Sequence, residues 1–193
     1  MKRITVFCGS SYGNKDIYKT LARRVGQTRA KQNIGLVYGG AKVGLMGAVA
    51  DGGLLEGGKV IGVLPTFLGS KEIAHDKLTE LIMVESMHER KTKMHELCDG
   101  VIALPGGFGT MEELFEILTW AQLGLHGKPI GLLNVDGFYD HLVAMIQGMV
   151  DNGLLKEINQ HMLLVSDTVD NLLEQMKRYK APTVGKWITK ETV

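Results

Sequence analysis

This 193-residue chain has few cysteines, few prolines and almost no excess of one charge sign. Its two cysteines, Cys8 and Cys98, lie in separate apolar segments, which is typical of buried thiols in a reduced protein; the alternative is a disulfide between them. With 22 basic and 21 acidic residues, the formal net charge of +1 is too small to attract the chain to nucleic acid or to a membrane surface. Because no apolar run is long enough to span a bilayer, and the N-terminal one has only strand length, we expect a cytoplasmic protein without a signal peptide.

Short β-rich runs instead alternate with helical patterns along the chain. The apolar runs near residues 60, 101 and 130 are continuous, which is typical of parallel strands covered on both faces. The alternation predicts right-handed βαβ crossovers, and therefore an α/β fold with a doubly wound, mainly parallel sheet and helices on both faces. We expect a single Rossmann-like domain over 1–181 and a C-terminal tail over 182–193. The predicted strands are 4–8, 34–38, 60–64, 81–84, 101–104, 130–133 and 162–165, and the predicted helices are 17–31, 45–56, 88–98, 111–123, 138–149 and 169–179.

Glycine-bearing turns follow three of the predicted strands, at 9–13, 39–44 and 105–109. In a doubly wound sheet the carboxyl ends of parallel strands meet at one edge, and ligands bind there near the switch in strand order. Any one of these turns could be an ordinary tight turn. Together they predict a nucleotide-sized pocket at this edge.

The most informative segment is 105–113, with the sequence Pro-Gly-Gly-Phe-Gly-Thr-Met-Glu-Glu. Glycines at the start of a helix let the backbone approach a phosphate, and the unpaired N–H groups there favour an anion. Thr110 can add a hydroxyl, and Glu113, one turn later, would lie beside whatever the phosphate carries. The structural alternative is a capping box, in which Thr110 caps the helix and Glu113 reaches back to it.

A second group of charged residues occupies 86–94, after the strand predicted at 81–84. Ser86 is a plausible helix N-cap, which places Arg90 and Lys91 in the second helical turn. A solvated charged face is the default interpretation of such a run. The alternative is a pair of cations that balances a phosphate near Glu113, because arginine grips planar pairs of oxygen atoms.

Other known motifs are incomplete in this sequence. Glu112 stands where a dinucleotide-binding fingerprint that begins at Gly107 needs glycine, which disfavours an NAD enzyme. The segment 53–60 imitates a phosphate-binding loop but ends in Val60 and runs into a predicted strand. His95 and Cys98 could share a helix face, but no further ligands complete a metal site.

Two of these segments carry a resemblance to a known family. Met87-x-x-Arg90-Lys91, together with Pro105-Gly-Gly-x-Gly-Thr110-x-x-Glu113, is similar to the lonely guy (LOG) family of cytokinin-activating phosphoribohydrolases. Segments 8–11, 37–47, 120–124 and 128–131 match further blocks of that family, so the resemblance covers roughly residues 1–165.

The resemblance implies hydrolysis of the N-glycosidic bond of a nucleoside 5′-monophosphate, either AMP or an N6-substituted AMP, which gives a free base and ribose 5-phosphate. It implies no metal and no organic cofactor, a homodimer with sites near the subunit interface, and a catalytic pair formed by Arg90 and Glu113. Apolar helical residues in 114–125 offer a possible contact face for the second chain. The residues implied to line the substrate are Glu72, Arg90, Lys91, Gly106, Gly107, Phe108, Gly109, Thr110, Met111, Glu112, Glu113 and Thr119.

Two other functions compete with hydrolysis. Members of this family are often labelled lysine decarboxylases, but the sequence shows no Schiff-base lysine with a pyridoxal cradle. A non-catalytic nucleotide or cofactor carrier is the stronger alternative, because related carriers share the glycine loop. A protein that keeps the nucleotide fold only for interaction is a third class. Glu113 together with Arg90 favours the hydrolase over both.

Overall fold

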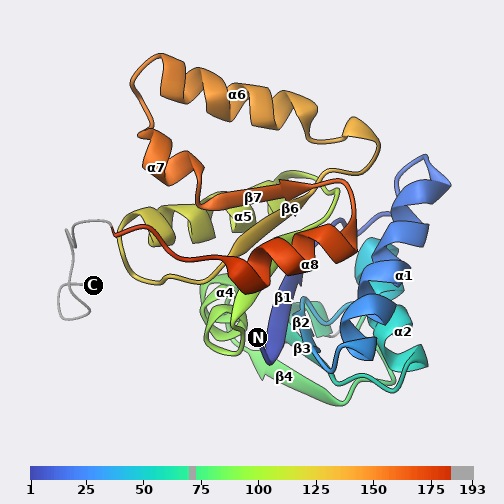
Figure 1. Cartoon of the computed structure of the whole chain (residues 1–193). Helices are drawn as coiled ribbons and strands as arrows, with labels where there is room; N and C mark the ends of the chain where they lie inside the picture. Colours follow the sequence, from blue (N-terminus) through green and yellow to red (C-terminus); the bar gives the residue numbers. More distant parts are fainter. Residues whose placement is uncertain (70–72, 184–193) are drawn as a thin grey trace.

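The computed structural model describes residues 1–69 and 73–183, which build one seven-stranded sheet between two layers of helices (Figure 1). The strand order is β4-β3-β2-β1-β5-β6-β7, and every neighbouring pair is parallel. All seven predicted strands are confirmed, and the sheet is parallel throughout. The strands are β1 (Arg3–Phe7), β2 (Gly35–Tyr38), β3 (Val60–Pro65), β4 (Glu80–Val84), β5 (Gly100–Ala103), β6 (Ile130–Leu133) and β7 (Leu163–Ser166).

The helices divide between the two faces of the sheet (Figure 1). One layer holds α1 (Asp16–Lys31), α2 (Gly44–Leu55) and α8 (Val169–Arg178), and the other holds α4 (Met87–Glu96), α5 (Phe108–Gln122) and α6 (Asp140–Asp151). These six helices confirm the six predicted ones. Three short elements were not predicted, namely α3 (Thr66–Gly69), η1 (Val135–Gly137) and α7 (Glu157–Gln160), because a single turn is too short to show a helical period.

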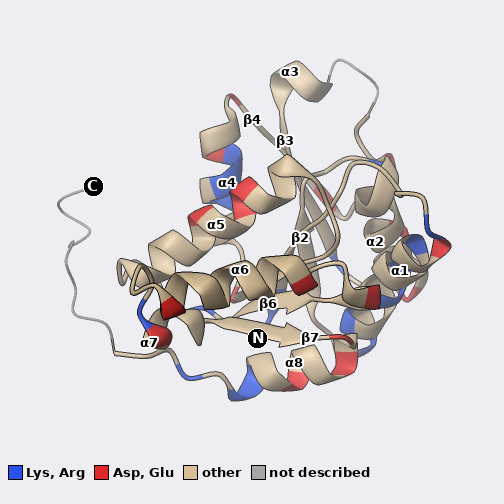
Figure 2. Cartoon of the chain, turned by 90° about the horizontal axis from the view of Figure 1, so that it is seen from above, with Lys and Arg blue, Asp and Glu red and all other residues tan. Residues whose placement is uncertain are grey.

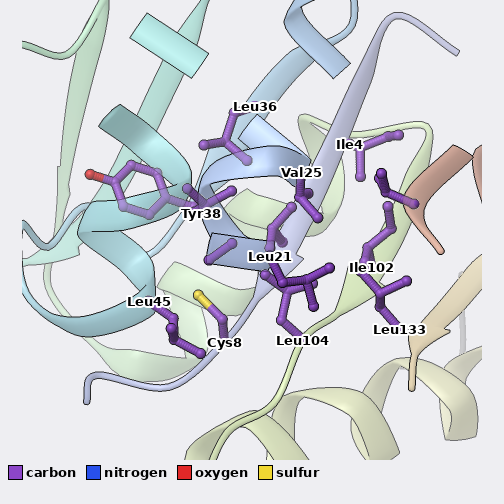
Figure 3. Packing of buried hydrophobic residues seen from close by; sticks show 14 of the residues in the cluster. Ile4, Cys8, Leu21, Val25, Leu36, Tyr38, Leu45, Ile102, Leu104 and Leu133 are labelled. Carbon is purple, nitrogen blue, oxygen red and sulfur yellow. The ribbon is translucent and has the colours of Figure 1, made fainter. Parts of the chain in front are cut away.

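The core consists of two apolar clusters, one on each face of the sheet. Figure 3 shows the cluster beneath α1 and α2, where Leu21 and Val25 of α1 pack against Leu36 of β2 and Ile102 of β5. On the opposite face, side chains of α4 and α5 such as Leu114 cover the same strands. Every residue of β2, β3, β5 and β6 is buried, which is why these strands appear in the sequence as continuous apolar runs.

The strand order places the switch of the sheet between β1 and β5. From β1 the chain adds β2, β3 and β4 on one side, and it then crosses to β5 on the other side. The loops that leave β1 and β5 touch: the Gly9 N–H donates to the Pro105 carbonyl at 3.1 Å. Two glycine turns thus flank the crevice in which an open α/β sheet binds its ligand.

Both cysteines are buried and unpaired, so the prediction of buried thiols is confirmed and the disulfide alternative is wrong. No helix in the described part of the chain is long and apolar enough to cross a membrane. The tail predicted over 182–193 lies outside the described residues from 184 onward.

Candidate active site

A cavity of about 240 Å³ opens at the switch point, above the carboxyl ends of β1 and β2. Its walls come from the loop after β1, from Gly39 after β2, from Arg90 and Met94 of α4, and from the first turns of α5 with Glu113. The predicted convergence of the three glycine turns is confirmed, because each of them contributes to this wall.

Arg90 and Glu113 form a buried ion pair in this cavity. Arg90 Nη1 donates to Glu113 Oε1 at 3.2 Å, and Arg90 Nε donates to the Val63 carbonyl at 3.1 Å. The two residues are only 8% and 9% exposed, so a solvated charged face is the wrong interpretation for Arg90. The Ser86 hydroxyl caps α4 by accepting from the Glu89 N–H at 3.1 Å, as predicted, and thereby sets where the arginine falls on the helix.

The absence of a side chain at Gly39 makes room for the guanidinium group. A Cβ atom at this position would stand 1.9 Å from Arg90 Nη2, so any larger residue would push the arginine out of its place. The turn after β2 therefore takes part in positioning Arg90 opposite Glu113.

Burial changes the chemistry of the carboxyl group. It raises the pKa of Glu113 from its ordinary 4.5 to about 7, because the ionised form is poorly solvated; Arg90 acts in the opposite direction, and Glu112 adds to the rise. A carboxyl group that titrates near neutral pH inside a cleft can both donate and accept protons, which is the property expected of a general acid–base residue.

The glycine loop leaves open space above the start of α5. A Cβ atom at Gly107 or Gly109 would meet nothing within 4 Å, and the Phe108 side chain is 96% exposed. The first backbone hydrogen bond of the helix runs from the Met111 N–H to the Gly107 carbonyl at 3.1 Å. The three N–H groups before it therefore have no partner within the helix, and together with the helix dipole they favour an anion.

The capping-box alternative for Thr110 and Glu113 is wrong. The N-cap of α5 is Gly107, and the helix begins at Phe108, three residues earlier than predicted. Thr110 is therefore inside the helix and buried, packed beneath Gly106, where a Cβ atom would come within 2.1 Å of its hydroxyl oxygen. Because Glu113 is bonded to Arg90, its carboxylate does not serve as a cap.

A second set of charges lies beside this pair. Figure 2 shows basic residues on α4 beside acidic residues on α5. Lys91 Nζ donates to Glu116 Oε1 at 3.0 Å and also to Glu112. The Lys91 side chain is 7% exposed, so it too departs from a solvated face. None of these three residues is part of the cavity wall among the described residues.

The remaining predicted contacts are spread more widely. Thr119 lies on α5 and lines a different cavity, between α5, α6 and α7, where its hydroxyl donates to the Phe115 carbonyl at 2.7 Å. Met111 is half-buried and outside the wall of the main cavity. Glu72 lies outside the described residues.

Several residues of the wall are not among the predicted site residues. Cys8 and Ser10 follow β1 directly, and Met94 lies one helical turn after Arg90. The sequence contains a signal for each. Residues just past a parallel strand lie at the edge of the sheet where ligands bind, and residues four apart on a helix share one face.

Residues that could hold a metal do not gather here: across 1–69 and 73–183, no three metal-ligating side chains lie close enough to bind an ion. Likewise, the described wall of the main cavity contains no lysine that could form a Schiff base.

Comparison with known proteins agrees with this geometry. The model of a family described as "possible lysine decarboxylase" matches residues 46–176. The chain is 44% identical, over 95% of its length and 81% of the relative's, to the cytokinin riboside 5′-monophosphate phosphoribohydrolase LOG5 of Arabidopsis thaliana. It is also 44% identical, over 98% of its length and 77% of the relative's, to the probable enzyme of the same name LOGL2 of Oryza sativa subsp. japonica.

Solved structures support the same fold at lower identity. The molybdenum cofactor binding protein of Rippkaea orientalis superposes with a TM-score of 0.71 at 24% identity, over 92% of this chain and 97% of that one. The molybdenum cofactor carrier protein of Chlamydomonas reinhardtii gives 0.66 at 20% identity, over 91% and 96%. Identity this low supports only the fold. The plant enzymes match along nearly the whole sequence, and the chain therefore belongs to the lonely guy (LOG) family.

Proposed function

We propose that this protein hydrolyses the N-glycosidic bond of AMP or of an N6-substituted AMP, which releases the free base and ribose 5-phosphate. The observation that carries the proposal is the buried Arg90–Glu113 pair, 3.2 Å apart, directly beside the open glycine loop. The names of the plant relatives give the same activity on cytokinin riboside 5′-monophosphates.

The 5′-phosphate binds at the start of α5. Gly107 and Gly109 leave room for it, and the unpaired N–H groups of the first helical turn point toward it. Binding there places the ribose one helical turn along α5, beside Glu113. The energy of phosphate binding then positions the sugar for reaction.

Glu113 in its ionised form stabilises the sugar cation that develops as the base departs, and it orients the attacking water. Arg90 holds that carboxylate in place and keeps part of it ionised despite burial. Departure of the base gives a nitrogen that takes up a proton from solvent, because the guanidinium of Arg90 does not lose its own. Because the pKa of Glu113 is about 7, hydrolysis should lose rate as the pH falls below neutrality.

A cofactor carrier is the competing function, and one experiment separates the two. Purified protein is incubated with AMP and with N6-prenylated AMP, and free base and ribose 5-phosphate are measured by mass spectrometry. Equal amounts of both products from either nucleotide support the hydrolase. Binding of both nucleotides without any product supports the carrier.

We also propose a homodimer, in which α6 and α7 contribute to the interface. Only Ile146 of α6 is buried within the chain, while Met145, Leu154 and Ile158 nearby are 56%, 83% and 43% exposed. Exposed apolar groups of this kind favour a protein partner. Thr119 lies on the same side, so a second chain there would bring it near a subunit interface. Light scattering coupled to gel filtration tests the dimer; a monomer mass at micromolar concentration would contradict it.

A further inference from the structure

We propose that His75 and Asp51 are positioning residues for Arg90, although neither lies in the described wall of the main cavity. Their side chains join the segment 73–77 to α2, and this segment holds the glycine turn 39–42 that makes room for the guanidinium. Neither residue is among those that the family resemblance implies. The inference rests on the proposed function and deepens it, because it assigns how the buried ion pair is held in place for catalysis.

The turn after β2 has few contacts of its own to keep it in place. Gly39 and Gly40 carry no side chains that could pack, and glycine loses more conformational freedom on folding than any other residue. The position of the turn nevertheless matters. A Cβ atom at Gly39 would stand 1.9 Å from Arg90 Nη2 and 3.0 Å from Met46 Sδ, so the backbone there lies directly against both side chains. Contacts from other segments therefore fix the turn.

The segment 73–75 supplies such contacts, because it forms an antiparallel bridge with the turn. The Lys42 N–H donates to the Ile73 carbonyl at 2.8 Å. The His75 N–H donates to the Gly40 carbonyl at 3.0 Å. These two hydrogen bonds hold the backbone of the turn directly after the glycine that faces the guanidinium.

The imidazole ring of His75 links this segment to α2. Its side chain is only 7% exposed, and both ring nitrogens are hydrogen-bonded. The Lys77 N–H donates to Nδ1 at 3.2 Å, so Nε2 carries the hydrogen and donates to Asp51 Oδ1 at 3.1 Å. Asp51 lies on α2, the helix that follows the glycine turn in the chain. The turn is thus held between its own helix and a segment that is bonded to that helix.

The bond between His75 and Asp51 acts locally. The Asp51 side chain is 58% exposed, so the bond adds little to the free energy of unfolding of the whole protein. Its loss instead lowers the free energy of a local opening, in which the segment 73–77 separates from the turn. The guanidinium of Arg90 then loses the fixed surface against which it lies, and its alignment with Glu113 becomes less exact.

The test uses substitutions in the full-length protein that separate the two bonds of the ring. In His75→Asn the amide oxygen replaces Nδ1 but cannot reach Asp51, whereas in His75→Gln the amide nitrogen replaces Nε2 and can still donate to Asp51. His75→Asn and Asp51→Ala should each lower kcat for AMP about tenfold and change KM less than about threefold, because the loop that binds the phosphate is untouched. His75→Gln should keep kcat within about threefold of wild type. The double variant of His75→Asn and Asp51→Ala should lose no more than either single variant.

The matched control is Asp76→Asn. Asp76 and Lys42 form an ion pair of 3.5 Å between the same segment and the same turn, with side chains that are 77% and 43% exposed. Because an exposed pair contributes little, this variant should keep the wild-type kcat and KM. A purely structural role of His75 would lower the urea midpoint of His75→Asn without lowering kcat of the folded protein.

A second measurement does not depend on activity. The Arg90 Nε–H group donates to the Val63 carbonyl and gives its own ¹H–¹⁵N resonance, which is assigned with Arg90→Ala. Its hydrogen exchange without substrate should be at least about tenfold faster in His75→Asn and Asp51→Ala than in wild type or Asp76→Asn. Faster exchange in a protein that hydrolyses no nucleotide would overturn the proposed function while supporting the positioning role. Unchanged exchange in both variants, or a His75→Gln variant as impaired as His75→Asn, would overturn the inference.

Discussion

Glu113→Gln should make the protein more stable at alkaline pH, because it removes a charge whose burial opposes folding. The pKa of Glu113 is about 7 in the folded protein and near 4.5 in the unfolded chain. The folded state therefore binds the proton more tightly, and wild-type stability falls as the pH rises from about 4.5 through about 7. At about 1.4 kcal/mol for each pKa unit, the loss amounts to about 3 kcal/mol above pH 8.

Glutamine has nearly the volume of the protonated carboxyl group and carries no charge, so the variant escapes this loss. Urea unfolding at a fixed protein concentration is the suitable assay, since a dimer would make stability depend on concentration. With a slope of about 2 kcal/mol per molar urea, the midpoint of Glu113→Gln should exceed that of wild type by about 1.5 M at pH 8.5. At pH 5 the two midpoints should nearly coincide.

The matched control is Glu96→Gln, which alters an exposed carboxylate on α4 and should shift the midpoint little at either pH. Equal midpoints of wild type and Glu113→Gln at pH 8.5, or a less stable variant at that pH, would refute the assignment of Glu113 as a buried carboxyl group that resists ionisation.

Adenosine should be hydrolysed far more slowly than AMP, because it lacks the phosphate that the glycine loop binds; comparable kcat/KM for the two would contradict that loop assignment. Arg90→Ala should abolish most turnover and lower the free energy of unfolding at pH 8.5 by more than about 1 kcal/mol, since it leaves Glu113 buried without a partner; unchanged urea midpoints would argue against the buried pair. Gly39→Ala should reduce kcat at least about tenfold by displacing the guanidinium; a wild-type kcat in this variant would count against the role of Gly39.

Much of the fold could be predicted from the sequence, because parallel strands buried on both faces leave continuous apolar runs that periodicity detects. The run at 101–104 followed by the glycine loop is the clearest case, because it indicates both a strand and the helix that follows it. Exact boundaries could not be predicted: α5 begins at Phe108, three residues before the predicted start, since Gly109 within its first turn also permits helical geometry.

The residues of the site could be predicted from the sequence more readily than the contacts between them. Arg90 and Glu113 were selected from their motifs, but their burial together was not, because it depends on how α4 and α5 pack on the sheet. A charged run such as 86–94 looks like a solvated face when only its own helix is considered. The pairing of Lys91 with Glu112 and Glu116 also depends on how α4 and α5 pack, and no local sequence pattern predicts it.

The most direct test of the account is turnover of AMP by Glu113→Gln beside its binding of AMP. Wild-type protein should release free base and ribose 5-phosphate, and the variant should do so about 10²–10⁴ times more slowly, the range typical of lost general acid–base catalysis. Calorimetry should show that the variant still binds AMP at least as well, because a carboxylate no longer repels the phosphate. A Glu113→Gln variant that binds AMP and hydrolyses it at the wild-type rate would contradict the catalytic role of Glu113.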